Sequence, residues 1–158
     1  MAETETEIKV GKPAPDFELP DENGERVRLS DQRGKPVALV FLPAAFSPVC
    51  TTEMCAYRDD YSEFEAKGAR VFSISHDSRW ALKAWKEAMG LKHTLLSDAK
   101  GEVARLYGCW NEELGLAERL TVVIDREGVI RYVTRSGLTE PRDHREALAA
   151  IEGAAKAA

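Results

Sequence analysis

Two short runs of alternating apolar and polar residues open the patterned part of the chain. They cover residues 17–19 and 26–29 and flank the turn sequence Pro-Asp-Glu-Asn-Gly at residues 20–24. Alternation with a period of two is typical of strands with one buried face, so this segment predicts a β-hairpin. Residues 37–42 follow as a continuous apolar run of strand length. Such a run predicts a strand buried on both faces of an α/β sheet.

Helical periodicity appears after this strand. Over residues 51–66 large apolar side chains recur every three or four positions among charged residues, and Lys67-Gly68 supplies a helix stop. A second segment with this spacing runs from Trp80 to Met89 and ends at Gly90. The remaining pattern predicts strands at 71–75, 94–96, 120–124 and 129–133, a short helix at 103–107 and an alanine-rich helix over 142–157.

The order of these elements predicts one α/β domain. A hairpin, a strand–helix–strand–helix unit, a short strand and helix, a second hairpin and a final helix fit one mixed β-sheet flanked by helices on both faces. A thioredoxin-like fold has this order and places a functional loop between the first buried strand and its helix. We expect residues 8–158 of the 158-residue chain to form this domain, and residues 1–7 to be a flexible tail.

Composition narrows the classes of function. Hydrophobic residues make up 44% of the chain, enough for a buried core, while 22 basic and 27 acidic residues give a net charge of −5. This balance argues against a dedicated binder of nucleic acids or anionic membranes, which would carry a basic patch. The acidic start is unlike a secretory signal, and no apolar run approaches the ~20 residues of a membrane span. We therefore expect a soluble cytoplasmic protein.

The chain has three cysteines, Cys50, Cys55 and Cys109, and an odd number excludes a fully paired intramolecular disulfide framework. In a chain of this size, catalysis, redox chemistry or metal binding explains cysteines better than scaffolding does. The three histidines are scattered, and none stands at metal-ligand spacing from a cysteine, so we expect no metal site. Glycine-rich phosphate-binding motifs are absent from the sequence as well.

The loop after the first buried strand carries the most reactive combination of residues. Cys50 lies where the next helix begins, and the free N–H groups of a helix N-terminus stabilise an anion such as a nucleophilic thiolate. Ser47 offers a hydroxyl to that sulfur or to a substrate oxygen, and Pro43 and Pro48 restrict the loop. At this point a small, inert, buried residue is an equally good interpretation of Cys50.

The spacing Pro43-x-x-x-Ser47-x-x-Cys50 resembles the active-site motif of the peroxiredoxins, in which threonine is the usual residue at the position of Ser47. A second cysteine five positions on, Cys55, is similar to the bacterioferritin-comigratory-protein (PrxQ) class. Residues 107–131 look more like the AhpE class. Together these resemblances extend over residues 8–150.

The resemblance implies a thiol peroxidase that needs no metal, haem or flavin cofactor. The Cys50 thiolate would attack hydrogen peroxide or an organic hydroperoxide and become a sulfenic acid. The family's arginine matches Arg119, which would stabilise both the thiolate and a peroxide oxygen; on its own Arg119 would be interpreted as a surface charge. Glu53 would orient this arginine, although a carboxylate in a first helical turn is equally well explained by the helix dipole.

Cys55 is the candidate resolving cysteine that the PrxQ class implies. On an intact helix, five residues mean a rise of ~7.5 Å and a net rotation of ~140°, so Cys50 and Cys55 cannot form a disulfide while residues 50–55 stay helical. The resemblance therefore implies that oxidation unwinds this turn. The alternative is that Cys55 packs in the core beside Met54. We expect Cys109 to be structural, with an alternative resolving role and an intersubunit role left open.

The expected partners are a hydroperoxide substrate, thioredoxin or another thiol reductant and, by analogy with the AhpE class, a second copy in a homodimer. Three other functions stay open. One is a one-cysteine peroxidase recycled by an external thiol. Another is a thiol–disulfide oxidoreductase, which normally has Cys-x-x-Cys where this chain has Ser47-x-x-Cys50. The third is a redox sensor on the same fold.

Overall fold

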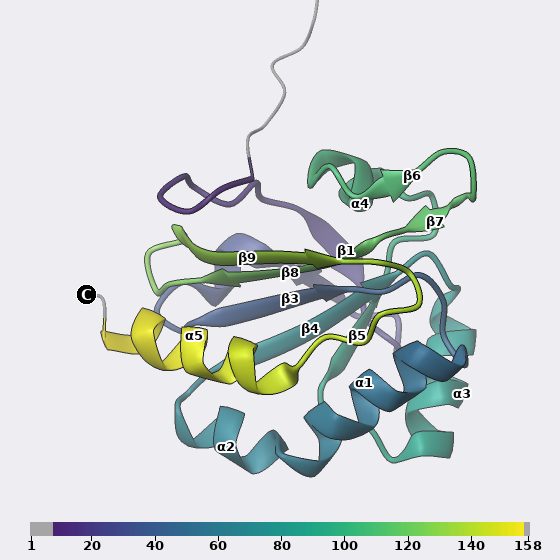
Figure 1. The fold of residues 1–158 in the computed structure, drawn as a ribbon, viewed down its shortest axis with the longest axis horizontal. Coiled ribbons are helices and arrows are strands. Elements are labelled where there is room, and N and C mark those ends of the chain that lie inside the picture. The colour runs from purple at the N-terminus through teal and green to yellow at the C-terminus, as the bar shows by residue number, and fades with distance from the viewer. Residues whose placement is uncertain (1–7, 157–158) are drawn as a thin grey trace, which may run out of the picture.

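A five-stranded mixed sheet forms the centre of the structure, a computed structural model that describes residues 8–156 (Figure 1). Its strands are β3 (Val37–Phe41), β4 (Arg70–Ser75), β5 (Thr94–Ser97), β8 (Arg119–Ile124) and β9 (Ile130–Ser136). They lie in the order β5-β4-β3-β8-β9. β3, β4 and β5 are parallel, whereas β8 is antiparallel to both β3 and β9.

Helices cover both faces of this sheet (Figure 1). One face carries α1 (Pro48–Asp59), α2 (Tyr61–Ala66), α3 (Arg79–Met89) and α5 (His144–Lys156). The other face carries α4 (Glu102–Leu106) and the N-terminal hairpin of β1 (Glu18–Pro20) and β2 (Arg26–Arg28), which leads into a 3-10 helix, η1 (Leu29–Gln32). The arrangement is the mixed, doubly covered sheet with an added hairpin that the sequence pattern predicts.

The central strand β3 shows why the sheet needs two cores. All five of its residues are buried, and successive side chains point to opposite faces. Val37, Leu39 and Phe41 pack in the core beneath α4 and the hairpin, while Ala38 and Val40 pack beneath the four other helices. The second of these cores also contains Cys50, so the interior of the domain holds the start of α1.

Two helices differ clearly from the sequence-based prediction. The helix predicted over 51–66 begins earlier, at Pro48, which occupies a favourable first helical position. It is also interrupted at Asp60, whose backbone leaves the helical region between α1 and α2. The last helix begins at His144 rather than 142, and residue 157 and the predicted tail at 1–7 lie outside the described residues.

A small hairpin after α4 was not predicted from the sequence. It consists of β6 (Trp110–Asn111) and β7 (Leu116–Ala117), with two residues in each strand. Strands of two residues are too short to show a periodic pattern, which explains why hydrophobicity alone misses them.

The site is positioned by the way strand ends meet at one edge of the sheet. β3 ends at Phe41, which pairs with Leu120 near the beginning of antiparallel β8. The loop from Pro43 to Ser47 therefore starts beside Arg119, although 69 residues separate Arg119 from Cys50. Parallel β4 and β5 end at the same edge with paired Ser75 and Ser97.

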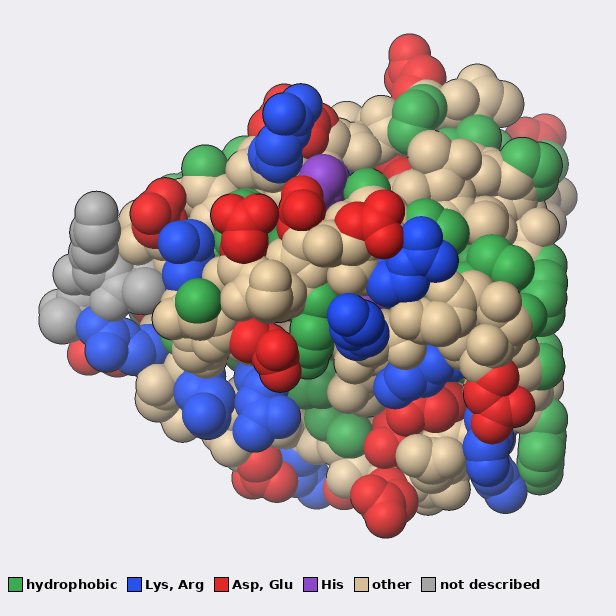
Figure 2. Space-filling model, turned by 90° about the horizontal axis from the view of Figure 1, so that it is seen from below, with side chains coloured by type: hydrophobic (Ala, Val, Ile, Leu, Met, Phe, Trp, Pro, Cys, Tyr) green, Lys and Arg blue, Asp and Glu red, His purple; other side chains and the backbone are tan. Residues whose placement is uncertain are grey.

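The face seen from below in Figure 2 carries acidic and basic side chains interspersed with one another. Within residues 8–156, no helix is both long and apolar enough to cross a membrane.

His93 is buried in the core beneath α1. Its Nε2 lies 2.8 Å from the hydroxyl of Ser73, which in turn lies 3.1 Å from the sulfur of Met54. Burial, followed by repulsion from Lys86, lowers the pKa of His93 to about 3. His93 is therefore neutral in the folded protein at any pH near neutrality.

We predict that His93 makes the protein less stable in mild acid. Its pKa in the unfolded chain is about 6.5, so below that pH the unfolded state binds a proton that the folded state does not. The free energy of unfolding should fall as the pH drops from about 6.5 toward 3, by about 2 kcal/mol between pH 7 and pH 5. Urea unfolding of wild type and His93→Gln at these pH values measures the effect. Equal decreases in the two proteins would contradict it.

Candidate active site

Cys50 lies in the first turn of α1, which follows the loop after β3. Ser47 is the N-cap residue with extended backbone, Pro48 is the first helical residue and Cys50 is the third. The Ser47 side chain makes no capping hydrogen bond to this helix, so it leaves the amide N–H groups of Val49 and Cys50 available as hydrogen-bond donors. The Cys50 side chain is fully buried. The sequence-based placement of Cys50 at a helix start is thus found in the structure.

Arg119 lies against Cys50 from the neighbouring strand. Its guanidinium Nη1 is 3.3 Å from the Cys50 sulfur, and its Nε donates to the carbonyl oxygen of Leu138 at 2.9 Å. Only 2% of Arg119 is exposed. This burial excludes the interpretation as a solvated surface charge, and it fixes a permanent cation beside the sulfur.

Glu53 faces Arg119 from the next turn of α1. Its Oε1 accepts from Arg119 Nη1 at 2.7 Å, and 3% of the residue is exposed. The contact through which Glu53 would orient Arg119 is therefore present. Because Glu53 is buried and bonded to Arg119, its interaction with the dipole of α1 does not by itself explain its position.

A second arginine, Arg142, completes the cluster and was missed in the sequence. Its backbone N–H and Nε donate to Glu53 Oε2 at 2.7 and 2.8 Å, and its Nη2 donates to Oε1 at 2.9 Å. Its Nη1 reaches the hydroxyl of Thr121 in β8 at 3.2 Å. Arg142 lies 89 residues from Glu53, in the segment before α5, and no local pattern marks it.

The cluster carries an excess of positive charge. Two guanidinium groups surround one carboxylate, and the remaining positive charge faces the sulfur through Arg119. In a buried site such a charge is little screened by solvent. The arrangement can therefore stabilise negative charge on Cys50 or on an oxygen bound beside it.

The hydroxyl of Ser47 is oriented within the loop. Its hydrogen is donated to the carbonyl oxygen of Ala44 at 2.9 Å. A hydroxyl has one hydrogen, so in this conformation Ser47 presents only lone pairs to other groups. It can accept a hydrogen bond from a substrate but does not donate one to Cys50. Pro43 is buried at the base of the same loop.

Cys55 lies on α1 but away from the cluster. Residues 48–59 form one uninterrupted helix, so the five-residue separation keeps the sulfurs of Cys50 and Cys55 apart. Cys55 is partly exposed and belongs to neither buried core, which excludes the interpretation that it packs in the core beside Met54.

Cys109 is fully buried in the core on the α4 side of the sheet. Burial raises the pKa of the Cys109 thiol to about 12. Both properties favour a structural role.

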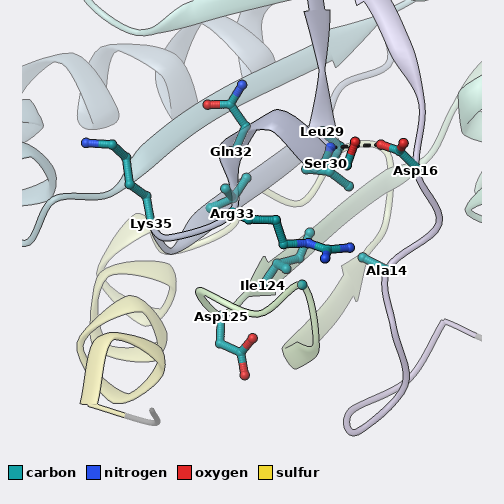
Figure 3. Close-up of a pocket in the computed structure, with 11 residues that line it drawn as sticks. Ala14, Asp16, Leu29, Ser30, Gln32, Arg33, Lys35, Ile124 and Asp125 are labelled. Carbon is teal, nitrogen blue, oxygen red and sulfur yellow. Dashed lines mark hydrogen bonds between the residues drawn. The ribbon is translucent and has the colours of Figure 1, made fainter.

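The small cavity drawn in Figure 3 lies at the opposite edge of the sheet, near the start of β3 and the end of β8. Its volume is about 20 Å³, room for about one water molecule. Ala14, Asp16, Arg33 and Asp125 are among the residues that line it. The cavity therefore has neither the size nor the position to serve Cys50.

Comparison with known proteins identifies the family of the chain. The model of the AhpC/TSA family matches residues 10–133. Alkyl hydroperoxide reductase E of Mycobacterium tuberculosis is 41% identical over 150 residues, covering 91% of this chain and 98% of that protein. The chloroplastic peroxiredoxin Q of Suaeda salsa is 40% identical over 138 residues, covering 87% of this chain; the chain spans 64% of the length of that relative.

Solved structures agree as well. The crystal structure of Enterococcus faecalis AhpC superposes with a TM-score of 0.86 at 29% identity, covering 93% of this chain and 92% of that one. The peroxidoxin BcpB from Mycobacterium tuberculosis superposes with a TM-score of 0.84 at 35% identity, covering 93% and 98%.

Fold and site together define an enzyme of the peroxiredoxin class. The chain belongs to the AhpC/TSA family. The predicted thioredoxin-like fold and the resemblance to the PrxQ and AhpE classes are confirmed. Membership implies thiol-dependent reduction of a hydroperoxide, with a thiol as the source of electrons. The roles of the individual site residues stay predictions.

We predict that the two cysteines other than Cys50 differ sharply in reactivity. In the Cys50→Ser variant at pH 8, iodoacetamide should label the partly exposed Cys55 and leave Cys109 unlabelled, since only about 10⁻⁴ of a thiol with a pKa near 12 is ionised at that pH. Peptide mass mapping measures the labelling, and urea should expose both cysteines. Labelling of Cys109 in the folded protein at the rate of Cys55 would contradict the prediction.

Proposed function

We propose that this protein reduces hydrogen peroxide and organic hydroperoxides through Cys50, its peroxidatic cysteine. The observation that carries the proposal is the contact of 3.3 Å between the buried Cys50 sulfur and the Arg119 guanidinium, at the uncapped start of α1. A thiolate held between a fixed cation and free amide donors is activated for nucleophilic attack.

In the proposed reaction the thiolate attacks the outer oxygen of the peroxide. A sulfur–oxygen bond forms while the oxygen–oxygen bond breaks, and its electron pair leaves with the departing oxygen. That oxygen takes a proton from solvent and becomes water or an alcohol, and the sulfur is oxidised to a sulfenic acid. Arg119 and the amides of Val49 and Cys50 stabilise the developing negative charge.

The proposed role of Ser47 is to bind and orient the peroxide. Because its hydrogen is engaged by Ala44, its oxygen accepts the hydrogen of the peroxide hydroxyl and orients the peroxide toward sulfur. Pro43 keeps the loop in this shape. Glu53 and Arg142 hold Arg119 in position without contacting sulfur themselves, so we propose that they are positioning residues.

We further propose that Cys55 resolves the sulfenic acid. Its thiolate attacks the Cys50 sulfur, a disulfide forms and the sulfenic oxygen leaves as water after protonation. This requires the first turns of α1 to unwind, because the helix keeps the two sulfurs apart. Unwinding must also release Glu53, which lies between the two cysteines and is held by both arginines.

Thioredoxin or a similar dithiol protein is the proposed reductant, in a reducing compartment such as the cytoplasm. The partial exposure of Cys55 supports direct exchange with such a protein. A homodimer stays a prediction, and light scattering would distinguish it, at twice the 17.5 kDa of one chain, from a monomer.

The function is tested by following NADPH consumption with thioredoxin, thioredoxin reductase and either hydrogen peroxide or cumene hydroperoxide. We expect peroxide-dependent consumption by wild type and none by Cys50→Ser. The absence of peroxide-dependent activity with any thiol donor would overturn the proposal. Rapid disulfide exchange without peroxide would instead indicate a thiol–disulfide oxidoreductase.

The role of Arg119 is tested in the same assay with a matched pair of variants. Arg119→Met should lower kcat/KM by about 10²–10³, the usual effect of removing one preorganised charge-stabilising donor. Arg135→Met is the control, since Arg135 is exposed and pairs in register with Leu120 on the neighbouring strand. Equal activity of the two variants would contradict the role of Arg119.

The resolving cysteine is identified by non-reducing mass mapping after one equivalent of peroxide. We predict a Cys50–Cys55 disulfide in wild type and in Cys109→Ser, and a persistent sulfenic acid in Cys55→Ser. A Cys50–Cys109 disulfide, or a persistent sulfenic acid in wild type, would refute the two-cysteine mechanism. The second result would indicate a one-cysteine peroxidase that an external thiol recycles.

A further inference from the structure

Asp77 connects the sheet to the loop that precedes Cys50. It lies two residues beyond the end of β4, at the edge where the loop begins. One of its carboxylate oxygens, Oδ2, accepts the backbone N–H of Ala45 at 2.7 Å. Ala45 stands in the loop between β3 and α1, two residues before Ser47.

The carboxylate of Asp77 is itself held in place. Oδ2 also accepts a hydrogen bond from the hydroxyl of Ser75 at 2.8 Å, and the Asp77 backbone N–H donates to the same hydroxyl oxygen at 3.3 Å. The Asp77 carbonyl oxygen accepts the hydroxyl of Ser97 at 2.7 Å. Ser75 and Ser97 are paired across the parallel strands β4 and β5, so these hydrogen bonds attach Asp77 to the ends of two strands of the central sheet.

The loop needs such an anchor because its backbone is strained. Phe46 has a φ of +67°, a left-handed conformation that a bulky L-residue rarely adopts. The Phe46 side chain is 54% exposed, so burial does little to enforce this conformation. The hydrogen bond from Ala45 to Asp77 fixes one side of Phe46, and the start of α1 at Ser47 fixes the other.

We propose that Asp77 is a positioning residue for the peroxidase reaction, acting through Ala45. By holding Ala45 it fixes the turn at Phe46, and this turn places the Ser47 oxygen and the amides of α1 around the peroxide. The inference rests on the proposed function of Cys50. It requires a hydrogen-bond acceptor at Oδ2 rather than a negative charge, so an asparagine whose amide oxygen takes that place preserves the role.

The test compares Asp77→Ala with Asp77→Asn by stopped-flow measurement of hydrogen peroxide reduction at Cys50. Asp77→Ala should lower the second-order rate constant about 10–100-fold, since a small misplacement of reacting groups costs this much. Asp77→Asn should remain within about 3-fold of wild type, because it retains the acceptor. Asp16→Ala is the matched control, because the Asp16 carboxylate also accepts a backbone N–H, from Ser30 at 2.8 Å (Figure 3). Asp16 lies beside the start of β3 and the end of β8, at the edge of the sheet opposite Cys50.

A second readout separates positioning from general damage to the fold. Iodoacetamide reacts with the Cys50 thiolate but uses neither the Ser47 oxygen nor the stabilisation of a departing peroxide oxygen, so Asp77→Ala should change alkylation of Cys50 far less than it changes peroxide reduction. If Asp77→Ala does not fold, Ser75→Ala carries the test with a smaller expected loss, because it removes one of the hydrogen bonds that orient the carboxylate.

The outcomes are distinct. Normal peroxide reduction by Asp77→Ala, equal losses in the alanine and asparagine variants, or equal losses of peroxide and iodoacetamide reactivity would overturn the role of Asp77. If wild type itself fails to react with peroxide while its thiols are reduced, the peroxidase function fails, and the role of Asp77 fails with it.

Discussion

The buried contact of one carboxylate with two guanidinium groups is the interaction on which the site depends. Glu53 joins α1 to β8 through Arg119 and to the segment before α5 through Arg142. Burying three charges is costly, and the cost is offset only when their hydrogen-bonding groups are well satisfied. Here both carboxylate oxygens accept from arginine, and the arginines also reach Leu138 and Thr121. The cluster therefore fixes the distance between the sulfur and its cation.

Two sets of contacts position the segment that carries the Cys50 sulfur. The charged cluster fixes the helix that carries Cys50, whereas Asp77 holds the loop that leads into that helix. Both are attached to the same edge of the sheet, the cluster through β8 and Asp77 through β4 and β5. A rigid sheet can thus position a reactive group whose own segments are a loop and a helix end.

The sequence predicts the framework well because strand and helix patterns are local. The buried run at 37–42, the amphipathic helices and the strands predicted at 120–124 and 129–133 all mark elements that the structure contains. The break at Asp60 and the two-residue strands β6 and β7 escape prediction, since neither produces a periodic pattern.

In the site, the positions of Cys50, Glu53 and Arg119 follow from one short motif and its family resemblance. Arg142 and Asp77 do not, because no motif marks them and each makes its contact with a segment far away in the chain. The hydrogen bond from Ser47 to Ala44 also depends on a loop conformation that spacing alone does not determine. Tertiary contacts, rather than composition or periodicity, identify these residues.

The position of Glu53 between Cys50 and Cys55 has a consequence for the lifetime of the oxidised enzyme. In the two-cysteine mechanism, the sulfenic acid persists until the helix opens, and during that interval a second peroxide molecule can convert it irreversibly to a sulfinic acid. In that mechanism, the strength with which the arginines hold Glu53 limits how fast the helix opens and therefore how long the sulfenic acid persists. If Cys55 resolves Cys50 in this way, a tighter cluster would keep the thiol better positioned and would also make the enzyme more sensitive to inactivation when peroxide is abundant.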